Sequence, residues 1–453
     1  MIINIDDLME LKTVKSITGK IFEDYNGIEF DSRRQTEGKL FVCLKGNKSD
    51  GHDFAGKALA TGARGVVSDS CEKITSFGQE ITLVLVESCE KFLLELANYM
   101  LLKNKIKVIA VTGSSGKTTT KEILYNYLSG IFKTIKTEGN FNNRLGIPWS
   151  ILNSAENNAD FLVAECGMNH SGELTEISEM LKPDIVLIIN VGYVHSGNFK
   201  NIEDIAQAKF EIASGLKKNG FLIANKSINS ILNFEKKFKN SISFGEEQDN
   251  FLSYTIIDFK HKKTRFIVNS QGKEQEFNLE IFPFEVENYA GAISVLLKIG
   301  IPLEKISFTI EKNFKENRME KFQKDGFDFI FDCYNSNPHS LSKILPLLNM
   351  IAPKWIVILG DMKELGENSI YWHQKIGQIF ADSVEGKLIC YGDMAVMFGE
   401  GAIKNNRNIG DVYFTNSLEE VYKLIKFLGK DYNVFVKGSR SMQMEKLKEH
   451  LGR

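Results

Sequence analysis

The sequence predicts an α/β protein of three domains, and three observations support this prediction. The chain has 453 residues, which is enough for about three domains of ordinary size. Short apolar runs alternate with helix-like stretches through the middle of the chain, and the same alternation starts again near residue 319. Such alternation is typical of parallel strands that are joined by right-handed helical crossovers.

The N-terminal domain is expected over residues 1–104 and is predicted to be a small α/β unit. It mixes short strands with helices, and the apolar spacing predicts helices over 54–61 and 90–102. The polar residues 103–105 follow the second helix and are expected to form the linker to the next domain.

The central domain is expected over residues 105–316 and is predicted to contain a doubly wound, mostly parallel sheet. Its strands and helices are expected, in chain order, at 108–111, 117–132, 161–164, 173–181, 185–191, 202–216 and 221–224. In residues 251–281 apolar and polar residues alternate around Lys-rich and Gln-Gly turns. This pattern predicts antiparallel strands appended to the parallel sheet. Helices over 286–299 and 303–313 are expected to complete the domain.

The C-terminal domain is expected over residues 317–453 and is predicted to be a second doubly wound, Rossmann-like α/β unit. Helices alternate with strands that are expected at 327–331, 355–359, 387–390, 412–414 and 434–436. Three polar loops, DCYNSNP, LGDMKELG and VKGSR, each follow one of these strands. Three such loops at one edge of a sheet predict a binding face.

The composition is that of a soluble globular protein. Hydrophobic residues make up 43% of the chain and charged residues 25%, so a sizeable core is expected. The net charge of −2 gives no electrostatic reason to expect a nucleic-acid partner. The first residues carry an acidic pair and no basic segment, and no apolar run reaches the ~20 residues that cross a bilayer. We therefore expect neither a signal peptide nor a membrane partner.

The cysteines favour a reduced, cytoplasmic protein. They are far apart in the sequence, at Cys43, Cys71, Cys89, Cys166, Cys333 and Cys390. Because no two form a CxxC motif, a thiolate zinc site or a disulfide scaffold is not expected. Free thiols in a cytoplasmic protein explain this pattern.

The most informative stretch is VIAVTGSSGKTT at residues 108–119, which predicts a nucleoside triphosphate site. An apolar strand leads into a loop in which Gly113 and Gly116 allow the backbone to approach an anion closely. The loop then opens a helix, whose first amides are unpaired and attract negative charge. Lys117 is expected on the β- and γ-phosphates of the nucleotide, and the Thr118 hydroxyl is expected to bind Mg²⁺.

This loop departs from the usual P-loop pattern, because Val111 stands where a glycine is expected. A plain turn between a strand and a helix is the alternative interpretation. The residues expected around the phosphates are Thr112, Gly113, Ser114, Ser115, Gly116, Lys117, Thr118 and Thr119.

Two further residues follow predicted strands of the central sheet. Glu165 ends the strand FLVAEC, and ligands of open α/β sheets bind beyond the carboxyl ends of strands. A carboxylate there either binds Mg²⁺ or is simply solvated in a loop, and position alone does not decide between the two. His195 follows the next strand, at the same expected edge. Taken alone, a histidine in this position is more often an ordinary loop residue than a ligand.

Three other polar residues carry no clear signal of their own. Lys209 lies on a predicted helix, where a solvated lysine is the ordinary interpretation. Asn288 is expected to begin a helix, where asparagine is a good cap. Arg318 lies in a charged junction and reads as a surface residue.

Polar clusters in two loops suggest substrate contacts. Asn140, Asn142 and Asn143 lie in TEGNFNNRLGIP, which reads either as an ordinary loop or as a site for a polar sugar or peptide. Ser32 and Arg33 follow a predicted strand, and a hydroxyl beside a guanidinium suits a phosphate. An ordinary charged loop is the alternative there.

Taken together, these segments resemble the ATP-dependent Mur ligases over nearly the whole chain. Residues 31–67 are similar to the family's uridine-nucleotide-binding domain, and TGSSGKTT is similar to its tight phosphate loop. GNFNNRLGIP, ECGMNHSGEL, NVGYVHSGNF and IAQAKFEI follow in family order. DCYNSNP and LGDMKELG most resemble the branch that adds D-alanyl-D-alanine to UDP-N-acetylmuramoyl-tripeptide.

The resemblance implies a cytoplasmic, monomeric ligase of peptidoglycan precursor synthesis, which acts through an acyl phosphate. It implies that the N-terminal domain binds the UDP-sugar, that the central domain binds ATP, and that the C-terminal domain binds the incoming dipeptide and closes over ATP. The implied cofactors are ATP, two Mg²⁺ ions and a carbamate that CO₂ forms on Lys209.

The resemblance also implies roles for individual residues. Glu165 and His195 match ligands of the second Mg²⁺, and the carbamate on Lys209 would complete that set. Lys117, His195 and Lys209 are the implied catalytic residues, and the implied metal ligands are Thr118, Glu165, His195 and Lys209. Residues that match contacts to adenine, phosphates and ribose are Asn288, Arg318 and Asp332. Residues that match substrate contacts are Ser32, Arg33, Asn140, Asn142, Asn143, Asn335, Asn337, Lys437 and Arg440.

Three positions depart from the family pattern. Arg144 stands where an acidic residue is frequent, which leaves the local substrate contacts open. Cys166 stands where methionine is common, and Cys333 stands where serine is usual. Neither cysteine removes an expected ligand.

Three rival functions differ from this interpretation in what they require. A folylpolyglutamate synthetase would have a similar central domain but no need for the UDP site suggested by DSRR. A small-molecule kinase would have no evident need for a carbamylated lysine. A non-catalytic nucleotide-binding module would be expected to lack the magnesium ligands, all of which are present in the sequence.

Overall fold

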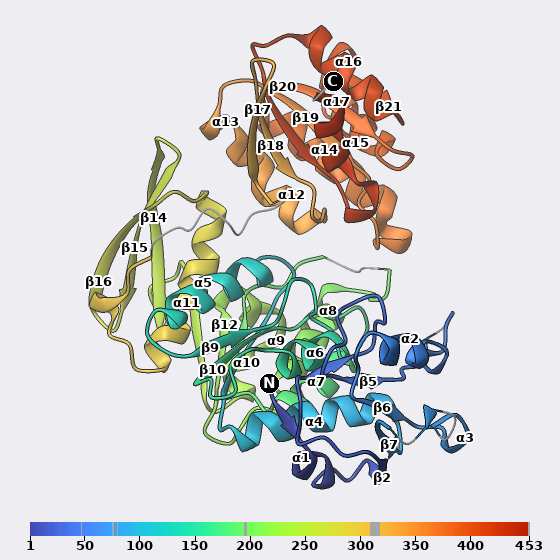
Figure 1. Ribbon diagram of the computed structural model, residues 1–453. Helices are drawn as coiled ribbons and strands as arrows, with labels where there is room; N and C mark the ends of the chain where they lie inside the picture. The colour runs from blue at the N-terminus through green and yellow to red at the C-terminus, as the bar shows by residue number, and fades with distance from the viewer. Residues whose placement is uncertain (47, 75–76, 79, 194–196, 309–317, 452–453) are drawn as a thin grey trace.

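The computed structural model describes residues 1–46, 48–74, 77–78, 80–193, 197–308 and 318–451 (Figure 1). Within these residues the chain forms three main sheets in succession, and we call the parts built on them the N-terminal, central and C-terminal domains. The predicted α/β fold is therefore confirmed. No helix of the described part of the chain is long and apolar enough to cross a membrane.

The N-terminal domain is built on a five-stranded sheet in the order β2-β7-β6-β5-β4. Its strands are β1 (Ile3–Asn4), β2 (Val14–Gly19), β3 (Asp24–Tyr25), β4 (Ile28–Glu29), β5 (Leu40–Val42), β6 (Gly65–Ser68) and β7 (Thr82–Val86). Its helices are α1 (Ile5–Met9), α2 (Ala55–Ala60), α3 (Cys71–Ile74) and α4 (Cys89–Lys103). In α4 the side chain of Ser88 caps the first turn, and Phe92 and Leu96 pack into the core. Strands β4, β5, β6 and β7 run parallel, and β2 is the antiparallel edge.

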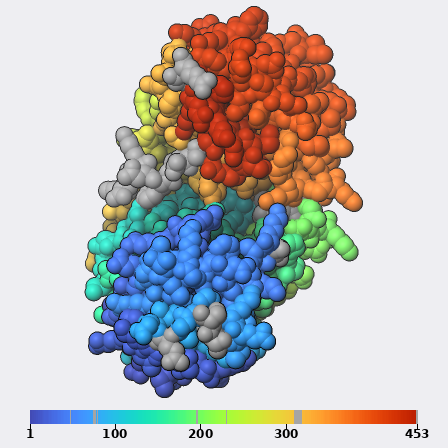
Figure 2. Space-filling view, turned by 45° about the vertical axis from the view of Figure 1, so that its right-hand side comes forward, coloured from blue at the N-terminus to red at the C-terminus, as the bar shows by residue number. Residues whose placement is uncertain are grey.

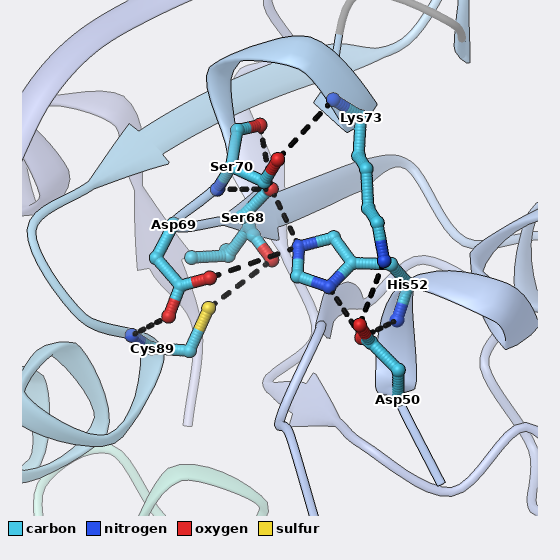
Figure 3. A network of polar contacts seen from close by, with 8 residues as sticks. Asp50, His52, Ser68, Asp69, Ser70, Lys73 and Cys89 are labelled. Carbon is cyan, nitrogen blue, oxygen red and sulfur yellow. Dashed lines mark hydrogen bonds and ion pairs between the residues drawn. The ribbon is translucent and has the colours of Figure 1, made fainter.

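A polar network inside this domain ties its elements together (Figure 3). The imidazole of His52 lies between Asp50 and Ser68: its Nδ1 is 2.6 Å from Asp50 Oδ1 and its Nε2 is 2.7 Å from Ser68 Oγ. Lys73 at α3 donates to the other oxygen of Asp50, at 2.7 Å. The order of groups resembles that of a hydrolytic triad, but Ser68 is fully buried. The network therefore joins the 3₁₀ turn Gly51–Phe54 to β6 and α3, and presents no nucleophile.

The central domain is built on a nine-stranded sheet in the order β16-β15-β14-β13-β12-β11-β8-β10-β9. Its strands are β8 (Lys107–Thr112), β9 (Thr134–Lys136), β10 (Phe161–Glu165), β11 (Ile185–Ile188), β12 (Phe221–Asn225), β13 (Ser241–Gly245), β14 (Leu252–Lys260), β15 (Lys263–Ser270) and β16 (Lys273–Leu279). Its helices are α5 (Lys117–Ser129), α6 (Gly146–Leu152), α7 (Glu173–Leu181), α8 (Ile202–Phe210), α9 (Asn229–Leu232), α10 (Phe234–Lys237) and α11 (Val286–Lys298). The sheet is parallel from β9 to β14, and β15 and β16 continue it as the predicted antiparallel strands.

Strand β8 lies at the centre of this sheet and is covered on both faces. Val108 and Ala110 pack into one core cluster, whereas Ile109 and Val111 pack into another. A continuous apolar run is what such a strand requires, because successive side chains point to opposite faces. The run therefore fixes β8 in the middle of the sheet, with its carboxyl end at the glycine loop.

The helix predicted over 202–216 is shorter than expected. Helix α8 ends at Phe210, and a 3₁₀ turn over Glu211–Ala213 follows. The Ser178 hydroxyl of α7 donates to Ile212 O at 2.5 Å and accepts from Gly215 N at 2.9 Å. A Cβ on Gly215 would also collide with the backbone of Ser178. Packing against α7 therefore ends the helix, an interaction that the local pattern does not reveal.

The helix predicted over 303–313 is wrong where the structure describes it. Only a 3₁₀ turn, Leu303–Lys305, forms there, and residues 306–308 are not helical. The Gln275 side chain on β16 donates to Ile306 O at 2.7 Å, and the buried Ile306 side chain packs into the core. These contacts hold the segment around Ile306 against β16 in a conformation that is not helical. Residues 309–317 lie outside the described residues.

The C-terminal domain is built on a six-stranded sheet in the order β17-β18-β22-β19-β20-β21, in which only β17 is antiparallel. Its strands are β17 (Glu320–Lys324), β18 (Phe327–Asp332), β19 (Trp355–Gly360), β20 (Gly386–Tyr391), β21 (Val412–Thr415) and β22 (Asn433–Lys437). Its helices are α12 (Pro338–Ile344), α13 (Leu348–Ile351), α14 (Ser369–Ser383), α15 (Val396–Lys404), α16 (Leu418–Leu428) and α17 (Leu447–Leu451). The three polar loops follow β18, β19 and β22, which are neighbours, so they lie at one edge as predicted.

Candidate functional site

A cavity of about 320 Å³ lies where the central and C-terminal domains meet. Figure 2 shows the C-terminal domain above and the N-terminal domain below, with the central domain between them. The cavity is bounded by the glycine loop after β8, the end of β10, the start of α11 and the loop after β18. It therefore lies beyond the carboxyl ends of parallel strands from two sheets, where α/β proteins bind ligands.

The glycine loop is held in place by the segment that follows β11. The amides of Ser114 and Ser115 each donate to Asn190 Oδ1, at 3.0 Å in both cases. The Ser114 hydroxyl donates to Gly192 O at 2.9 Å and accepts from Gly192 N at 2.8 Å. Helix α5 then starts at Lys117, whose ammonium donates to Gly113 O at 2.9 Å. Burial lowers the pKa of Lys117 from its ordinary value.

Gly116 is the residue in this loop whose backbone conformation and surroundings favour glycine. Its φ is +78°, and a Cβ at this position would collide with Asn288 Oδ1. Asn288 is not the helix cap that the sequence predicts, because the 3₁₀ turn Pro283–Glu285 leads into α11 and the helix begins at Val286. Its buried side chain instead lines the cavity beside the glycine loop.

Glu165 presents a carboxylate to the cavity from the end of β10. The side chain is 4% exposed, and its Oε1 accepts from Asn142 Nδ2 at 3.0 Å. Its Oε2 is buried and has no hydrogen-bond partner in the described part of the chain. A buried carboxylate oxygen without a donor is costly, and a cation would satisfy it. The donor chemistry at Glu165 therefore fits Mg²⁺, which prefers oxygen ligands.

Lys121 is a buried residue of this site that sequence reasoning missed. It lies on the inner face of α5 and is fully buried. Its ammonium donates to Thr137 O at 2.8 Å, and it lies 3.3 Å from Glu122 Oε1 and 4.0 Å from Glu165 Oε2. The available signal is its spacing, because Lys121 falls three residues before Leu124 on the apolar face of the helix.

Lys209 is buried on α8 and lines the same cavity. Its side chain is 2% exposed, so it is not the solvated lysine of the ordinary interpretation. Burial, together with the nearby positive charge of Lys117, lowers the pKa of Lys209 well below its ordinary value. His195 lies outside the described residues. Within the described residues, no three or more His, Cys, Asp and Glu side chains gather as a metal cluster.

The C-terminal domain contributes a cation and an ion pair to the cavity. Arg318 donates to Thr118 Oγ1 at 3.1 Å, and its guanidinium lies 3.6 Å from the centroid of the Tyr334 ring, so it is not a free surface residue. Asp332 at the end of β18 forms an ion pair with the buried Lys437 of β22. Lys437 also donates to Asn335 O at 2.9 Å, and so holds the loop that follows β18.

The remaining expected substrate residues divide into two groups. Those that line the cavity are Asn142, Asn143, Asn335, Asn337 and Lys437. Those that do not line it are Ser32, Arg33, Asn140 and Arg440. The Arg33 side chain is 81% exposed and paired with Asp31, and Arg440 is paired with Glu445.

The neighbouring residue, Arg34, contacts two aromatic rings of the central domain. Its guanidinium carbon lies 5.0 Å from the Phe141 ring centroid and 4.9 Å from that of Trp149. The two rings are themselves stacked, with centroids 4.8 Å apart. Arg34 therefore joins the N-terminal domain to the loop that contains Asn140, Asn142 and Asn143.

The three departures from the family pattern have structural explanations. Arg144 forms ion pairs with Glu90 at the start of α4 and with Glu176 on α7, so it links the N-terminal and central domains. Cys166 and Cys333 are fully buried, and burial raises the pKa of both thiols. Both are therefore neutral packing residues.

Three family models match this chain in succession. The catalytic domain of the Mur ligase family matches residues 24–106, the Mur ligase middle domain matches 111–296, and the glutamate ligase domain of Mur ligases matches 317–440. A UDP-N-acetylmuramoyl-tripeptide–D-alanyl-D-alanine ligase from Haemophilus influenzae is 30% identical over an alignment of 459 positions. The alignment covers 97% of this chain and 97% of that one.

Solved structures give the same result. A crystal structure of MurF from Acinetobacter baumannii superimposes with a TM-score of 0.86 at 27% identity, and covers 100% of this chain and 99% of that one. A crystal structure of MurF ligase from Thermotoga maritima in complex with ADP has a TM-score of 0.81 at 26% identity, with coverage of 94% and 96%. The chain therefore belongs to the Mur ligase family.

Proposed function

We propose that this chain is an ATP-dependent ligase that joins D-alanyl-D-alanine to UDP-N-acetylmuramoyl-tripeptide in peptidoglycan precursor synthesis. The relatives that carry this name are similar over nearly their whole length. The observation that carries the proposal is that one cavity contains the glycine loop, Glu165, Lys209 and the loop after β18. These groups suit the activation of a carboxylate by a triphosphate.

The nucleotide would bind across the two domains. The first amides of α5 and Lys117 offer positive charge to the phosphates. Asn288, Arg318 and Asp332 lie at the same cavity, which supports the roles in binding adenine, phosphates and ribose that the family resemblance implies. The relative solved with ADP supports ATP as the nucleotide.

Two Mg²⁺ ions would be held by Thr118, Glu165, His195 and a carbamylated Lys209. When bound, they would supply positive charge that reduces the repulsion between two anions. The unpartnered Oε2 of Glu165 supports this assignment. Lys209 supports the carbamate, because its lowered pKa leaves part of the amine neutral, and only a neutral amine adds to CO₂. The proton released on that addition passes to solvent.

The reaction would proceed in two steps. A carboxylate oxygen of the tripeptide bonds to the γ-phosphorus of ATP, and the bond from that phosphorus to ADP breaks. The amine of D-alanyl-D-alanine then bonds to the activated carbonyl carbon, phosphate leaves with the former carboxylate oxygen, and the amine loses a proton. Lys117 and the loop amides offset the charge on the phosphates, and the cavity aligns the reactants.

The UDP-sugar would extend from the cavity towards the N-terminal domain, and the dipeptide would lie beside the loop after β18. Ser32 and Arg33 of the N-terminal domain, with Asn140, Asn142 and Asn143, would contact the UDP-sugar. Asn335 and Asn337 would face the dipeptide, with Lys437 acting through the loop that it holds. Arg440 would contribute only if the C-terminal domain moves. We propose that the protein acts as a monomer in the cytoplasm, with domains over 1–104, 105–316 and 317–453.

The proposal is tested by following ADP and inorganic phosphate with purified UDP-N-acetylmuramoyl-tripeptide. D-alanyl-D-alanine should release both products in equal amounts, and L-alanyl-L-alanine should release neither. Equal release with both dipeptides would contradict the proposed specificity. Release of ADP without free phosphate would instead show a kinase.

A further inference from the structure

We propose that Glu287 is a positioning residue, which couples the glycine loop to the C-terminal domain. It lies in the first turn of α11, directly before Asn288. Its carboxylate accepts hydrogen bonds from three donors on three other elements: Asn190, Asn225 and Lys343. This inference rests on the proposed function, because it takes the glycine loop as the part that holds the ATP phosphates.

On one side, Glu287 is connected to the glycine loop through a single side chain. Asn190 Nδ2 donates to Glu287 Oε2 at 3.0 Å, while Asn190 Oδ1 accepts from the amides of Ser114 and Ser115. Asn190 Nδ2 also donates to Ser115 Oγ at 3.3 Å, so this one carboxamide joins the glycine loop to Glu287. A shift of the Glu287 carboxylate would be transmitted to the backbone of the loop.

On the other side, Glu287 is connected to the C-terminal domain. Lys343 on α12 donates to Glu287 Oε2 at 2.7 Å, and α12 lies on the side of its domain that faces the central domain (Figure 1). Asn225 at the end of β12 donates to Glu287 Oε1 at 2.8 Å and fixes the other oxygen. Glu287 Oε2 therefore accepts from both Asn190, which holds the glycine loop, and Lys343, which lies in the C-terminal domain.

Burial makes this ion pair stronger than an exposed one. The Glu287 side chain is 12% exposed and that of Lys343 is 35% exposed. A pair that is shielded from water and completed by neutral donors is worth more than a solvent-exposed pair. A second ion pair between the same two domains, Lys321 with Glu280, provides a comparison at 3.2 Å, with 44% and 46% exposure. Lys321 lies on β17 and Glu280 directly after β16, and neither lines the cavity.

The test uses Lys343→Met and Lys321→Met in the full-length protein, each of which removes one charge between the two domains. In hydrogen exchange without nucleotide, a peptide that contains Ser114 and Ser115 should exchange about fivefold faster in Lys343→Met. A fivefold change is the low end of the range that is typical for coupling between two sites. In Lys321→Met the peptide should exchange as in the wild type. Equal exchange in the wild type and Lys343→Met would overturn the proposal, as would equal acceleration in both variants.

Steady-state kinetics give a second readout. Lys343 also lines the cavity, but its ammonium is paired with Glu287. Lys343→Met should therefore raise the KM for ATP about fivefold and change kcat by less than about twofold. The double variant Lys343→Met/Glu287→Gln should raise the KM for ATP no more than Glu287→Gln alone, because both residues act through one connection. Additive effects would contradict the connection. If the wild type does not ligate, the proposed function fails, while hydrogen exchange still decides the coupling.

Discussion

At the scale of single residues, burial changes what two lysines can do. Lys121 is fully buried, and its ammonium is committed to the Thr137 carbonyl and to the Glu122 carboxylate 3.3 Å away. Lys209 is also buried, but its neighbour is Lys117, which is a like charge. The pKa of Lys209 is lowered for both reasons, which favours the neutral amine over the ammonium.

Replacing Lys209 with alanine should reduce ligation by about 100-fold or more, as when a charge-stabilising group is lost. A short carboxylic acid should restore part of the activity, because it can occupy the place of the carbamate. The measurement is ADP release, with thermal unfolding to show that the variant is folded. Lys217→Ala is the matched control, because Lys217 is a partly exposed lysine paired with Asp184. Wild-type activity in Lys209→Ala would contradict the assignment.

Residues differ in how far the sequence alone identifies them. Lys117 and Thr118 follow from the loop pattern, because the chemistry of phosphate binding requires those types at that spacing. Lys209 is assigned only by resemblance, since a lysine on an amphipathic helix reads as solvated until packing buries it. Glu287 and Lys343 were missed for the same reason, because their partners come from other elements.

At the scale of elements, the glycine loop and α11 are fitted to each other. Gly116 has a positive φ, and its missing Cβ leaves room for Asn288. A change in the backbone of the loop at Gly116 would therefore displace the Asn288 side chain in the first turn of α11. This contact joins two elements that are about 170 residues apart in the chain, and it brings the phosphate end of the cavity against the residue expected at the adenine or ribose.

Two glycine substitutions separate backbone strain from this contact. Gly116 and Gly78 both have a φ of +78°, but a Cβ on Gly78 would meet no described atom within 4 Å. Both alanine variants should lose roughly 1–2 kcal/mol of unfolding free energy to the left-handed backbone. Only Gly116→Ala should also lose ATP binding, measured by calorimetry. Equal ATP affinity in the two variants would show that the contact with Asn288 does not shape the site.

Elements were predictable where their signal is local. The strands of the parallel sheets appear as apolar runs, and each run predicted as such a strand forms one. Strands β9 and β13 of the central sheet were not predicted. Strand β17 was missed because it is an edge strand of mostly exposed residues. The helices over 202–216 and 303–313 failed because contacts with α7 and β16 end them, and such contacts are not visible in a local pattern.

At the scale of the whole molecule, the site depends on how the C-terminal domain meets the central one. Arg318 reaches Thr118, Lys343 reaches Glu287, and the Tyr193 and Trp372 rings lie 4.8 Å apart. His339 on α12 packs against Gly192, where a Cβ would collide with its ring. The domain contact is therefore close to the segment that holds the glycine loop.

Acid should weaken this contact through His339. Burial, with the nearby Lys343 and Lys209, lowers the pKa of His339 to about 3, so the folded protein keeps this imidazole neutral. The unfolded chain takes up a proton below about pH 6.5, so stability falls as the pH drops from there. By about pH 5 the loss from this residue should reach roughly 2 kcal/mol.

This pH dependence can be measured by denaturant unfolding of the wild type and His339→Gln. The variant should lose less stability than the wild type between pH 7.5 and about pH 5, whatever its stability at neutral pH. Parallel pH profiles for the two proteins would show that the pKa of His339 is the same in the folded and unfolded protein, which would contradict its burial as a neutral imidazole.

The most direct test of the central claim follows one oxygen atom. The claim is that the terminal carboxylate of the tripeptide attacks the γ-phosphate, so that carboxylate should be labelled with oxygen-18 before ligation. The account predicts that the released inorganic phosphate contains one labelled oxygen and that the new amide retains the other. Inorganic phosphate without the label would contradict an acyl phosphate, and with it the proposed use of this site.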